Sequence, residues 1–234
     1  MADNQMGQNK PETPLDTLGI MASQQAILGQ NLRQVEMYTR RGLLSLLWHE
    51  PDGDAQKVGV VMVGGAMGGT LGPGDSLFHA LGEALVAVGV PAIRLSYRKP
   101  NDMDSCCVDT AAAVQLLVGS GADAVVIMGH SFGGAVAIRV AVGLSEMVCG
   151  VVTFATQSAG CEIAGGLHST PLLMFHGDSD SILPLEASEV VRAIAGTGDL
   201  HVMKGDDHLL AKSHDVMFST TMEWLNTVFA GVAS

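Results

Sequence analysis

The stretch that decides the fold is Ile127-Met128-Gly129-His130-Ser131-Phe132-Gly133-Gly134. The apolar residues 124–126 precede it, and the small and apolar residues 135–138 follow it. This order predicts a buried strand, then a sharp turn, then a helix. Residues 129–133 match the pattern G-x-S-x-G, in which a serine sits at the apex of a strand-to-helix turn with a strained backbone.

This turn explains why both outer positions of the pattern are glycine. Neighbouring backbone comes so close to the serine that Gly129 and Gly133 must lack a β-carbon. The turn presents the Ser131 hydroxyl and the Phe132 amide to one space, at a helix N-terminus that favours negative charge. Chance is the alternative, since the chain has 29 glycines. The flanking strand and helix patterns favour a nucleophile with half of an oxyanion hole.

Composition limits the class of protein. A chain of 234 residues with no linker in its middle predicts one main domain. The formal net charge of −12 and the lack of a basic run argue against nucleic-acid binding. The polar N-terminus and the short apolar stretches predict neither a secretory signal nor a membrane segment. Four cysteines are too few for a disulfide scaffold and favour a reduced, cytoplasmic setting.

The order of elements predicts an α/β protein. Residues 1–31 are expected to form an N-terminal tail, partly disordered or with a short helix at about residues 20–28. Residues 32–234 are expected to form a single domain that opens with an antiparallel hairpin over 35–48. Later strands are expected at 58–63, 91–96, 124–128, 150–154, 171–175 and 200–203. They alternate with helices, the first capped by Asp75, which predicts a mostly parallel sheet of about eight strands covered on both faces.

A serine nucleophile needs a base, and the base needs an acid that holds its tautomer. The segment His176-Gly177-Asp178-Ser179-Asp180-Ser181-Ile182-Leu183-Pro184 follows a predicted strand, so its two carboxylates belong to the carboxyl edge of the sheet. Asp180 is the first candidate for the acid and Asp178 the second. Turn formation is the alternative role for both, because Gly-Asp-Ser-Asp is typical of turns.

The candidate base is His208, in Gly205-Asp206-Asp207-His208. It follows the last predicted strand and precedes the C-terminal helix. His201 falls within that strand and His214 at the start of the helix, where structural roles are expected. The strand-to-helix turn that carries Ser131 is called a nucleophile elbow. The order Ser, Asp, His along the chain is the one expected for such an elbow.

Together these segments resemble the α/β-hydrolase superfamily from Gln34 onward, in the manner of serine esterases and dienelactone hydrolases without a cap domain. The motifs at 129–134, 176–184 and 205–208 carry the resemblance. It implies that the acid is the aspartate before the Leu-Pro pair, which matches Asp180, and that the base is His208. It also implies a second oxyanion donor after the strand at 58–63. Gly64-Gly65 replaces the usual His-Gly there, so Ala66 takes the donor position and Met67 is the alternative.

Other candidates are weaker. Tyr97 and Arg98 follow a strand at the same edge and are candidates for binding a substrate carboxylate, although a surface salt bridge is the simpler role. Asn101, Asp102 and Asp104 match no metal-ligand spacing. Cys106 and Cys107 open a helix and are expected to be inert. We expect no metal and no cofactor.

The expected function is hydrolysis of a small or medium ester through an acyl-enzyme intermediate. Residues 155–170, where relatives with a lid insert it, are too few for a lid domain, so an open site is expected. Thioesterase, lactonase and acyl-peptide hydrolase activities remain alternatives on the same triad, as does a non-catalytic binding role. Dienelactone hydrolases usually have cysteine at the nucleophile position, which counts against that activity. The expected partner is a small-molecule ester, and the sequence leaves a homodimer open.

Overall fold

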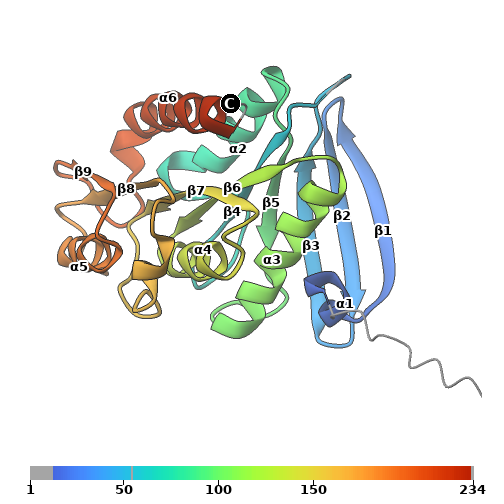
Figure 1. Ribbon diagram of the computed structural model, residues 1–234, viewed down its shortest axis with the longest axis horizontal. Coiled ribbons are helices and arrows are strands. Elements are labelled where there is room, and N and C mark those ends of the chain that lie inside the picture. The colour runs from blue at the N-terminus through green and yellow to red at the C-terminus, as the bar shows by residue number, and fades with distance from the viewer. Residues whose placement is uncertain (1–12, 54, 233–234) are drawn as a thin grey trace, which may run out of the picture.

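A nine-stranded sheet runs through the molecule (Figure 1). The computed structural model describes residues 13–53 and 55–232. The strands are β1 (Ile20–Gly29), β2 (Leu32–Thr39), β3 (Gly42–His49), β4 (Val58–Val63), β5 (Ala92–Ser96), β6 (Ala124–His130), β7 (Val148–Phe154), β8 (Leu172–Gly177) and β9 (Asp199–Met203). Their order across the sheet is β1-β2-β3-β5-β4-β6-β7-β8-β9.

The sheet is parallel from β5 to β9 and antiparallel at its other edge, where β1, β2 and β3 are added. The strand order changes direction at β4, which lies between β5 and β6. At such a switch point the loops after neighbouring strands diverge and leave room for a site. Val63 at the end of β4 is in register with Gly129 of β6. The glycine-rich loop after β4 therefore begins beside the predicted elbow.

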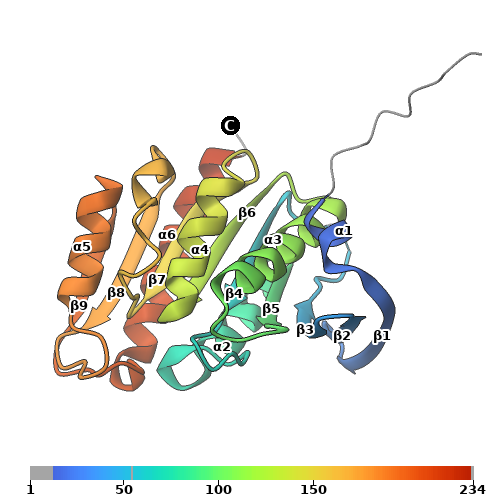
Figure 2. The same cartoon turned by 90° about the horizontal axis from the view of Figure 1, so that it is seen from below.

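Helices cover both faces of the sheet, as predicted (Figure 2). The α-helices are α1 (Pro14–Leu18), α2 (Pro73–Ala87), α3 (Met103–Gly119), α4 (Phe132–Gly143), α5 (Glu186–Ala195) and α6 (His214–Val232), and the short 3-10 helices are η1 (Ala164–Leu167) and η2 (Ala211–Ser213). α3, α4 and α5 pack over one apolar cluster, and α2 and α6 pack over another on the opposite face.

The central parallel strands are largely apolar because both of their faces are covered. Every residue of β4 and of β8 is buried, which is the environment that favours runs of Val, Leu and Met. Most of the phenylalanine side chains lie on the α2 and α6 face. Phe154 stacks on Phe175 at 5.3 Å between ring centroids and meets Phe78 edge-on at 5.9 Å.

The N-terminal region differs from the prediction. The prediction of a helix at about residues 20–28 is wrong, because this segment forms β1 and pairs antiparallel with β2. Every residue of β1 is exposed, so neither face of the strand has to be apolar. Its sequence therefore lacks the alternation of apolar and polar residues that indicates a half-buried strand. Pairing with β2 decides its conformation. The short helix α1 precedes it, and residues 1–12 of the predicted tail lie outside the described residues.

The start of α2 also differs from the prediction. Gly72, not Asp75, is the N-cap. Residues 74–76 have positive φ values, and regular helix begins only after them. A contact made far along the chain explains this, because the Gly74 N–H donates to the Leu209 carbonyl at 2.7 Å. This bond ties the start of α2 to the loop that follows β9.

The remaining predicted elements lie within a few residues of their expected bounds. The four cysteines are free thiols. Burial and the neighbouring Asp109 raise the pKa of Cys106 to about 12, as expected for an inert thiol. Within the described residues, none of the helices combines the length and the apolar character that crossing a membrane requires.

Candidate active site

Ser131 lies at the sharp turn between β6 and α4. Its backbone has φ 56° and ψ −119°, a conformation that side-chain-bearing residues adopt at an energetic cost. A β-carbon on Gly129 would lie 2.0 Å from the Gly133 carbonyl oxygen, and one on Gly133 would lie 2.3 Å from that of Gly64. The Ser131 N–H donates to the Phe154 carbonyl at 2.8 Å. The backbone therefore has the close approaches that the sequence pattern predicts.

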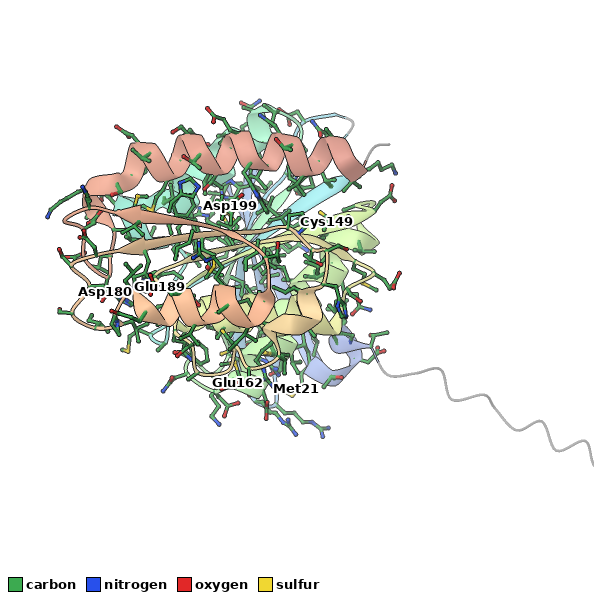
Figure 3. The ribbon with its side chains drawn as sticks, turned by 60° about the vertical axis from the view of Figure 1, so that its left-hand side comes forward. Met21, Cys149, Glu162, Asp180, Glu189 and Asp199 are labelled. Atoms are coloured by element: carbon green, nitrogen blue, oxygen red, sulfur yellow. The ribbon has the colours of Figure 1, made fainter. Side chains whose placement is uncertain are left out.

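Hydrogen bonds join the three predicted side chains. The Ser131 hydroxyl donates to His208 Nε2 at 2.9 Å, and His208 Nδ1 donates to Asp180 Oδ2 at 2.7 Å. Ser131 follows β6, Asp180 lies in the loop after β8 and His208 in the loop after β9, so all three come from the carboxyl edge of the sheet. Figure 3 shows Asp180 in its loop at one end of the molecule. The geometry fits the predicted order, and the catalytic roles remain predictions.

The Asp180 side chain is fully buried. Its Oδ1 accepts hydrogen bonds from the Ile182 and Leu183 amides at 2.8 and 2.9 Å. Burial acts to raise the pKa of Asp180, but the hydrogen bonds from Leu183, His208 and Ile182 outweigh it and hold this pKa below its ordinary value. The ionised carboxylate accepts a hydrogen bond from the Nδ1–H of His208, which keeps the ring proton on Nδ1 and leaves the lone pair of Nε2 directed at Ser131.

Asp178, the second candidate acid, and the histidines His201 and His214 make their contacts away from Ser131. Asp178 accepts a hydrogen bond from the Gly205 amide at 2.7 Å and so ties the loop after β8 to the loop after β9. The ring of His201 packs against an aromatic ring of β8. His214 Nδ1 donates to the Gly74 carbonyl. Each of these side chains has a structural partner, and none of these contacts joins it to Ser131.

His176 supports the site, although no motif in the sequence predicts a role for this side chain. It is fully buried at the end of β8. Its Nε2 lies 3.0 Å from the Leu183 carbonyl and 3.3 Å from Asp180 Oδ2, and its Nδ1 lies 2.6 Å from Ser188 Oγ. Because a carbonyl oxygen can only accept, Nε2 carries the proton. His176 therefore fixes the loop that holds Asp180.

His130, directly before the nucleophile, is the second supporting histidine. Its Nε2 lies 3.0 Å from the backbone carbonyl oxygen of His208 and donates to it. Burial lowers the pKa of His130 to about 4, so the ring is neutral near pH 7. The elbow and the histidine loop, 78 residues apart in sequence, are thus joined by a buried bond. For both His176 and His130, the sequence signal that could have predicted a supporting role is a histidine at the end of a strand, close to a candidate site residue.

The glycine-rich loop after β4 lies beside the nucleophile. A β-carbon built on Gly65 would be 3.5 Å from the Ser131 β-carbon, and Ala66, the next residue, packs partly on the core. The Met67 side chain is 93% exposed. Phe132 is buried and its ring meets Tyr97 edge-on at 6.4 Å. The assignment of Ala66 and Phe132 as oxyanion donors, with Met67 as the alternative, remains a prediction.

The candidates after β5 have structural partners. Arg98 forms a buried ion pair with Asp109, and its backbone amide donates to the same carboxylate at 2.9 Å. The salt bridge expected for Arg98 is therefore present, but buried. Tyr97 is 4% exposed and its hydroxyl donates to the Gly64 carbonyl at 3.4 Å. Asp102 caps α3 by accepting from the Ser105 amide.

One cluster has the donor atoms of a metal site. His49 of β3 and His79 and Glu83 of α2 place ligand atoms within 4.8 Å of one another. However, Arg94 Nε donates to His49 Nε2 at 2.9 Å, so the ring proton of neutral His49 sits on Nδ1, which faces Glu83 at 3.3 Å. A metal on Nδ1 would displace that proton and force a ring N–H against the guanidinium. This arrangement favours an electrostatic contact between the His49 N–H and the Glu83 carboxylate over metal binding.

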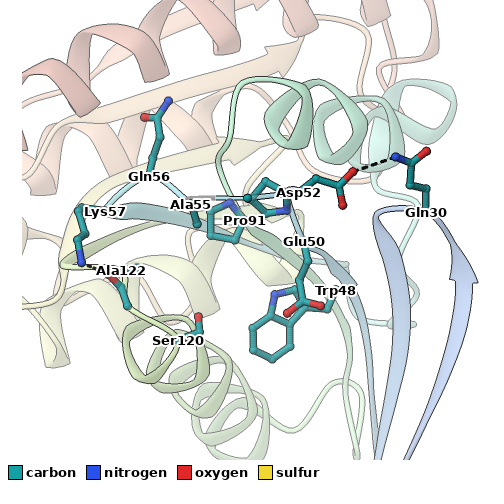
Figure 4. A pocket seen from close by; sticks show the side chains of 13 residues that line it. Gln30, Trp48, Glu50, Asp52, Ala55, Gln56, Lys57, Pro91, Ser120 and Ala122 are labelled. Carbon is teal, nitrogen blue, oxygen red and sulfur yellow. Dashed lines mark hydrogen bonds between the residues drawn. The ribbon is translucent and has the colours of Figure 1, made fainter.

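A cavity of about 510 Å³ lies where the parallel strands begin, at the opposite end of these strands from Ser131 (Figure 4). Trp48, Lys57 and Ala122 are among the residues that line it. The indole Nε1 of Trp48 has no hydrogen-bond partner among the described residues, but it is sealed from solvent, so a ligand in the cavity cannot reach it. None of the predicted site residues lines this cavity.

Comparison with solved structures identifies the fold. Est1E from Butyrivibrio proteoclasticus superimposes with a TM-score of 0.71 at 16% identity, over 84% of this chain and 99% of that one. The chain has the α/β-hydrolase fold. Dienelactone hydrolase from Anabaena variabilis gives 0.71 at 16% identity over 85% and 99% of the two chains. A serine hydrolase without a lid from Xanthomonas campestris gives 0.67 at 16% identity over 86% and 97%.

The likeness lies in the backbone. No family model and no curated protein matches the sequence, and identity to these α/β-hydrolase structures is low. The predicted fold class is confirmed, with nine strands against the expected eight or so. The extra strand is β1 (Ile20–Gly29), which lies within the predicted N-terminal tail.

Proposed function

We propose that the protein is a serine hydrolase of the carboxylesterase type, which cleaves small to medium acyl esters through an acyl-enzyme intermediate. The hydrogen-bonded chain from Ser131 through His208 to Asp180 supports this most directly. Each bond has the length and direction that activation of a serine hydroxyl needs. The esterases and hydrolases among the structural neighbours agree with the proposal.

The first half of the reaction transfers the acyl group to the enzyme. His208 Nε2 takes the hydroxyl proton of Ser131 while Oγ attacks the ester carbonyl carbon, and Asp180 stabilises the imidazolium that forms. The developing oxyanion is held by the backbone amides of Phe132 and Ala66. His208 then returns the proton to the leaving alcohol, and the carbon–oxygen bond breaks.

The second half releases the acid. Water enters the place of the alcohol, gives a proton to His208 Nε2 and attacks the acyl carbon, and collapse of the second tetrahedral intermediate frees the Ser131 hydroxyl. Every proton moves through one imidazole. No step calls for a metal or a cofactor.

The site has no lid domain over it, and its surroundings suit an ester that carries an apolar group. The connection between β7 and β8 contains only the short helix η1. Large apolar side chains that are exposed follow the site residues closely in sequence, namely Met67 at 93%, Ile182 at 68% and Leu209 at 58%. We infer that these side chains form an apolar rim at the site, which binds acyl or alkyl groups without burying a long chain.

Hydrolysis of p-nitrophenyl acetate, butyrate and palmitate tests the proposal. We expect turnover of acetate and butyrate, little turnover of palmitate, and loss of activity in Ser131→Ala. Thioester, lactone and acyl-peptide substrates, assayed in parallel, distinguish the alternative reactions on the same triad. A protein that hydrolyses none of these substrates, while folded by circular dichroism, contradicts the proposal and favours a binding role.

A further inference from the structure

Strand β1 forms an open edge of the sheet. All ten of its residues, Ile20–Gly29, are exposed. One side of β1 pairs with β2, and within the described part of the chain no strand pairs with its other side. Figure 1 shows β1 at the border of the molecule. A row of backbone N–H and C=O groups is thereby available to another strand.

This edge lacks the features that usually prevent pairing between chains. Exposed edge strands commonly carry lysine, proline or inward-pointing charges. The sequence of β1, IMASQQAILG, contains no charged residue and no proline, although the whole chain has a formal net charge of −12. Two such acidic chains can therefore approach through β1 with little electrostatic repulsion at the contact.

The sequence of β1 is self-complementary about Gln24. The apolar residues 20–22 and 26–28 flank the polar residues 23–25. In an antiparallel pair with a two-fold axis at Gln24, residue 22 opposes residue 26 of the other copy, and residue 23 opposes residue 25. Apolar positions then face apolar ones, and polar positions face polar ones. The register of β1 against β2 is regular from Ala22 to Ile27, so the middle of the strand has the geometry of a ladder.

We propose that β1 pairs with β1 of a second copy of this chain, antiparallel and centred on Gln24, so that two nine-stranded sheets form one continuous sheet. The contact is isologous, since the same strand serves on both sides and the two-fold axis closes the assembly. It leaves the carboxyl edge of the parallel strands, where Ser131 lies, outside the interface.

Apolar side chains at the ends of β1 add to the pairing. Through their register with β2, Ile20 and Ile27 lie on the face of the sheet that carries the buried residues Val35 and Met37. Ile20 is 41% exposed and Ile27 is 87% exposed. In the dimer, Ile27 of each copy falls beside the Ile20 end of the other β1. The apolar face of each sheet thus continues across the interface and loses exposed area.

Residues 1–12 of the same chain are the alternative partner for the open edge of β1. Their sequence contains three charged residues, Asp3, Lys10 and Glu12, and Pro11 lies close to their junction with the fold. Proline cannot donate to a ladder, and these charges have no counterpart on β1. The complementarity of β1 with itself therefore favours a second copy, and pairing within one chain is an outcome that the experiment must detect.

Two matched double variants of the full chain test the register. Ser23→Lys with Gln25→Lys places lysine opposite lysine at two points of the proposed interface. Ser23→Lys with Gln25→Glu places lysine opposite glutamate at the same two points. Molar mass is measured by light scattering across a concentration series, with circular dichroism as the folding control and p-nitrophenyl butyrate hydrolysis as the control for the distant site.

We expect the native chain and the Lys/Glu variant to be dimers and the Lys/Lys variant to dissociate, with a dimer Kd raised roughly tenfold or more at low salt and less at high salt. Activity per chain should stay the same. A native chain that is monomeric at 100 μM (roughly ten times a 10 μM dimer Kd), or a folded Lys/Lys variant that dimerises as tightly as the native chain, overturns the proposal. If the Lys/Glu variant dissociates too, the register about Gln24 is wrong.

Hydrogen exchange of the native chain gives a test that needs no variant. Amides of Ala22–Ala26 that face away from β2 should exchange slowly in the dimer and quickly after dilution to monomer. Slow exchange that does not depend on concentration shows that the edge is covered within one chain and overturns the proposal. Fast exchange at all concentrations does so as well, because the edge is then unpaired.

Discussion

His130 and His208 are joined by a buried hydrogen bond of 3.0 Å between the Nε2 of the first and the backbone carbonyl oxygen of the second. This bond connects the turn that carries Ser131 to the loop that carries the proposed base. The 2.9 Å distance from Ser131 Oγ to His208 Nε2 therefore depends on a side chain that does not itself react. Positioning of this kind matters because small displacements of a base reduce turnover strongly.

Replacement of His130 should lower kcat more than it changes KM. We expect His130→Ala to lower kcat on the order of tenfold, because the histidine loop loses its anchor. His130→Gln, whose amide can donate to the same carbonyl, should recover part of the loss. Steady-state kinetics on p-nitrophenyl butyrate measure both variants. Equal kcat in the native protein and in His130→Ala contradicts a positioning role.

The two aspartates of the loop after β8 should behave differently. Asp180 contacts His208, whereas Asp178 binds the Gly205 amide. Asp180→Asn should reduce kcat/KM by about 10³ to 10⁴, because the amide no longer holds the imidazole tautomer. Asp178→Asn, a matched change two residues away, should cost less than about tenfold, since it removes only a loop contact. If the Asp178 variant proves the more damaged, the assignment of the acid is wrong.

His176 should be important for stability as well as for activity. It is fully buried and serves both the Ser188 hydroxyl and the Leu183 carbonyl. His176→Leu leaves both groups without a partner, and we expect it to lower the free energy of unfolding by about 2–3 kcal/mol. Ser188→Ala should cost about 1 kcal/mol. Urea denaturation measures both changes, and a His176→Leu variant as stable as the native chain would refute the role.

Stability should fall between pH 7 and pH 5 because of buried histidines. Burial, together with the adjacent Arg94 guanidinium, lowers the pKa of His49 to about 4, from about 6.5 in an unfolded chain. Between these values the unfolded chain binds more protons than the folded one, so stability decreases as pH falls. The linkage contributes about 2 kcal/mol from His49 between pH 7 and pH 5.

His49→Gln isolates that contribution. The variant loses its titrating group, so its free energy of unfolding should drop by about 2 kcal/mol less than that of the native chain between pH 7 and pH 5. Titration of His130 and of the carboxylates is common to both proteins and cancels in the comparison. Urea titrations at the two pH values provide the measurement. Parallel pH dependences would show that His49 does not titrate as described.

Much of the fold was predictable because local signals and tertiary packing agree. Residues 58–63, for example, form a strand with the predicted bounds. The elbow pattern requires glycine at positions 129 and 133, where a β-carbon would collide with backbone. These features depend on short-range chemistry that the sequence displays directly.

The misread parts depend on contacts between distant segments. Residues 20–28 form a strand because β2 offers them an edge, and their own pattern carries no alternation. Asp75 is not the cap of α2 because Gly74 binds the Leu209 carbonyl across the loop after β9. The supporting bonds of His130 and His176 likewise form only when separate loops meet. Sequence patterns predicted the three side chains that hydrogen bonds join at the carboxyl edge of the sheet, but not the contacts that hold them in place.

The central claim is that Ser131 is a nucleophile activated by His208. Intact-mass spectrometry after incubation with a fluorophosphonate, followed by peptide mapping, tests it most directly. We predict one adduct per chain on the peptide that contains Ser131, slow labelling in His208→Ala, and no labelling in Ser131→Ala. A folded protein that forms no adduct, or one whose adduct lies on another residue and persists in Ser131→Ala, would contradict the account.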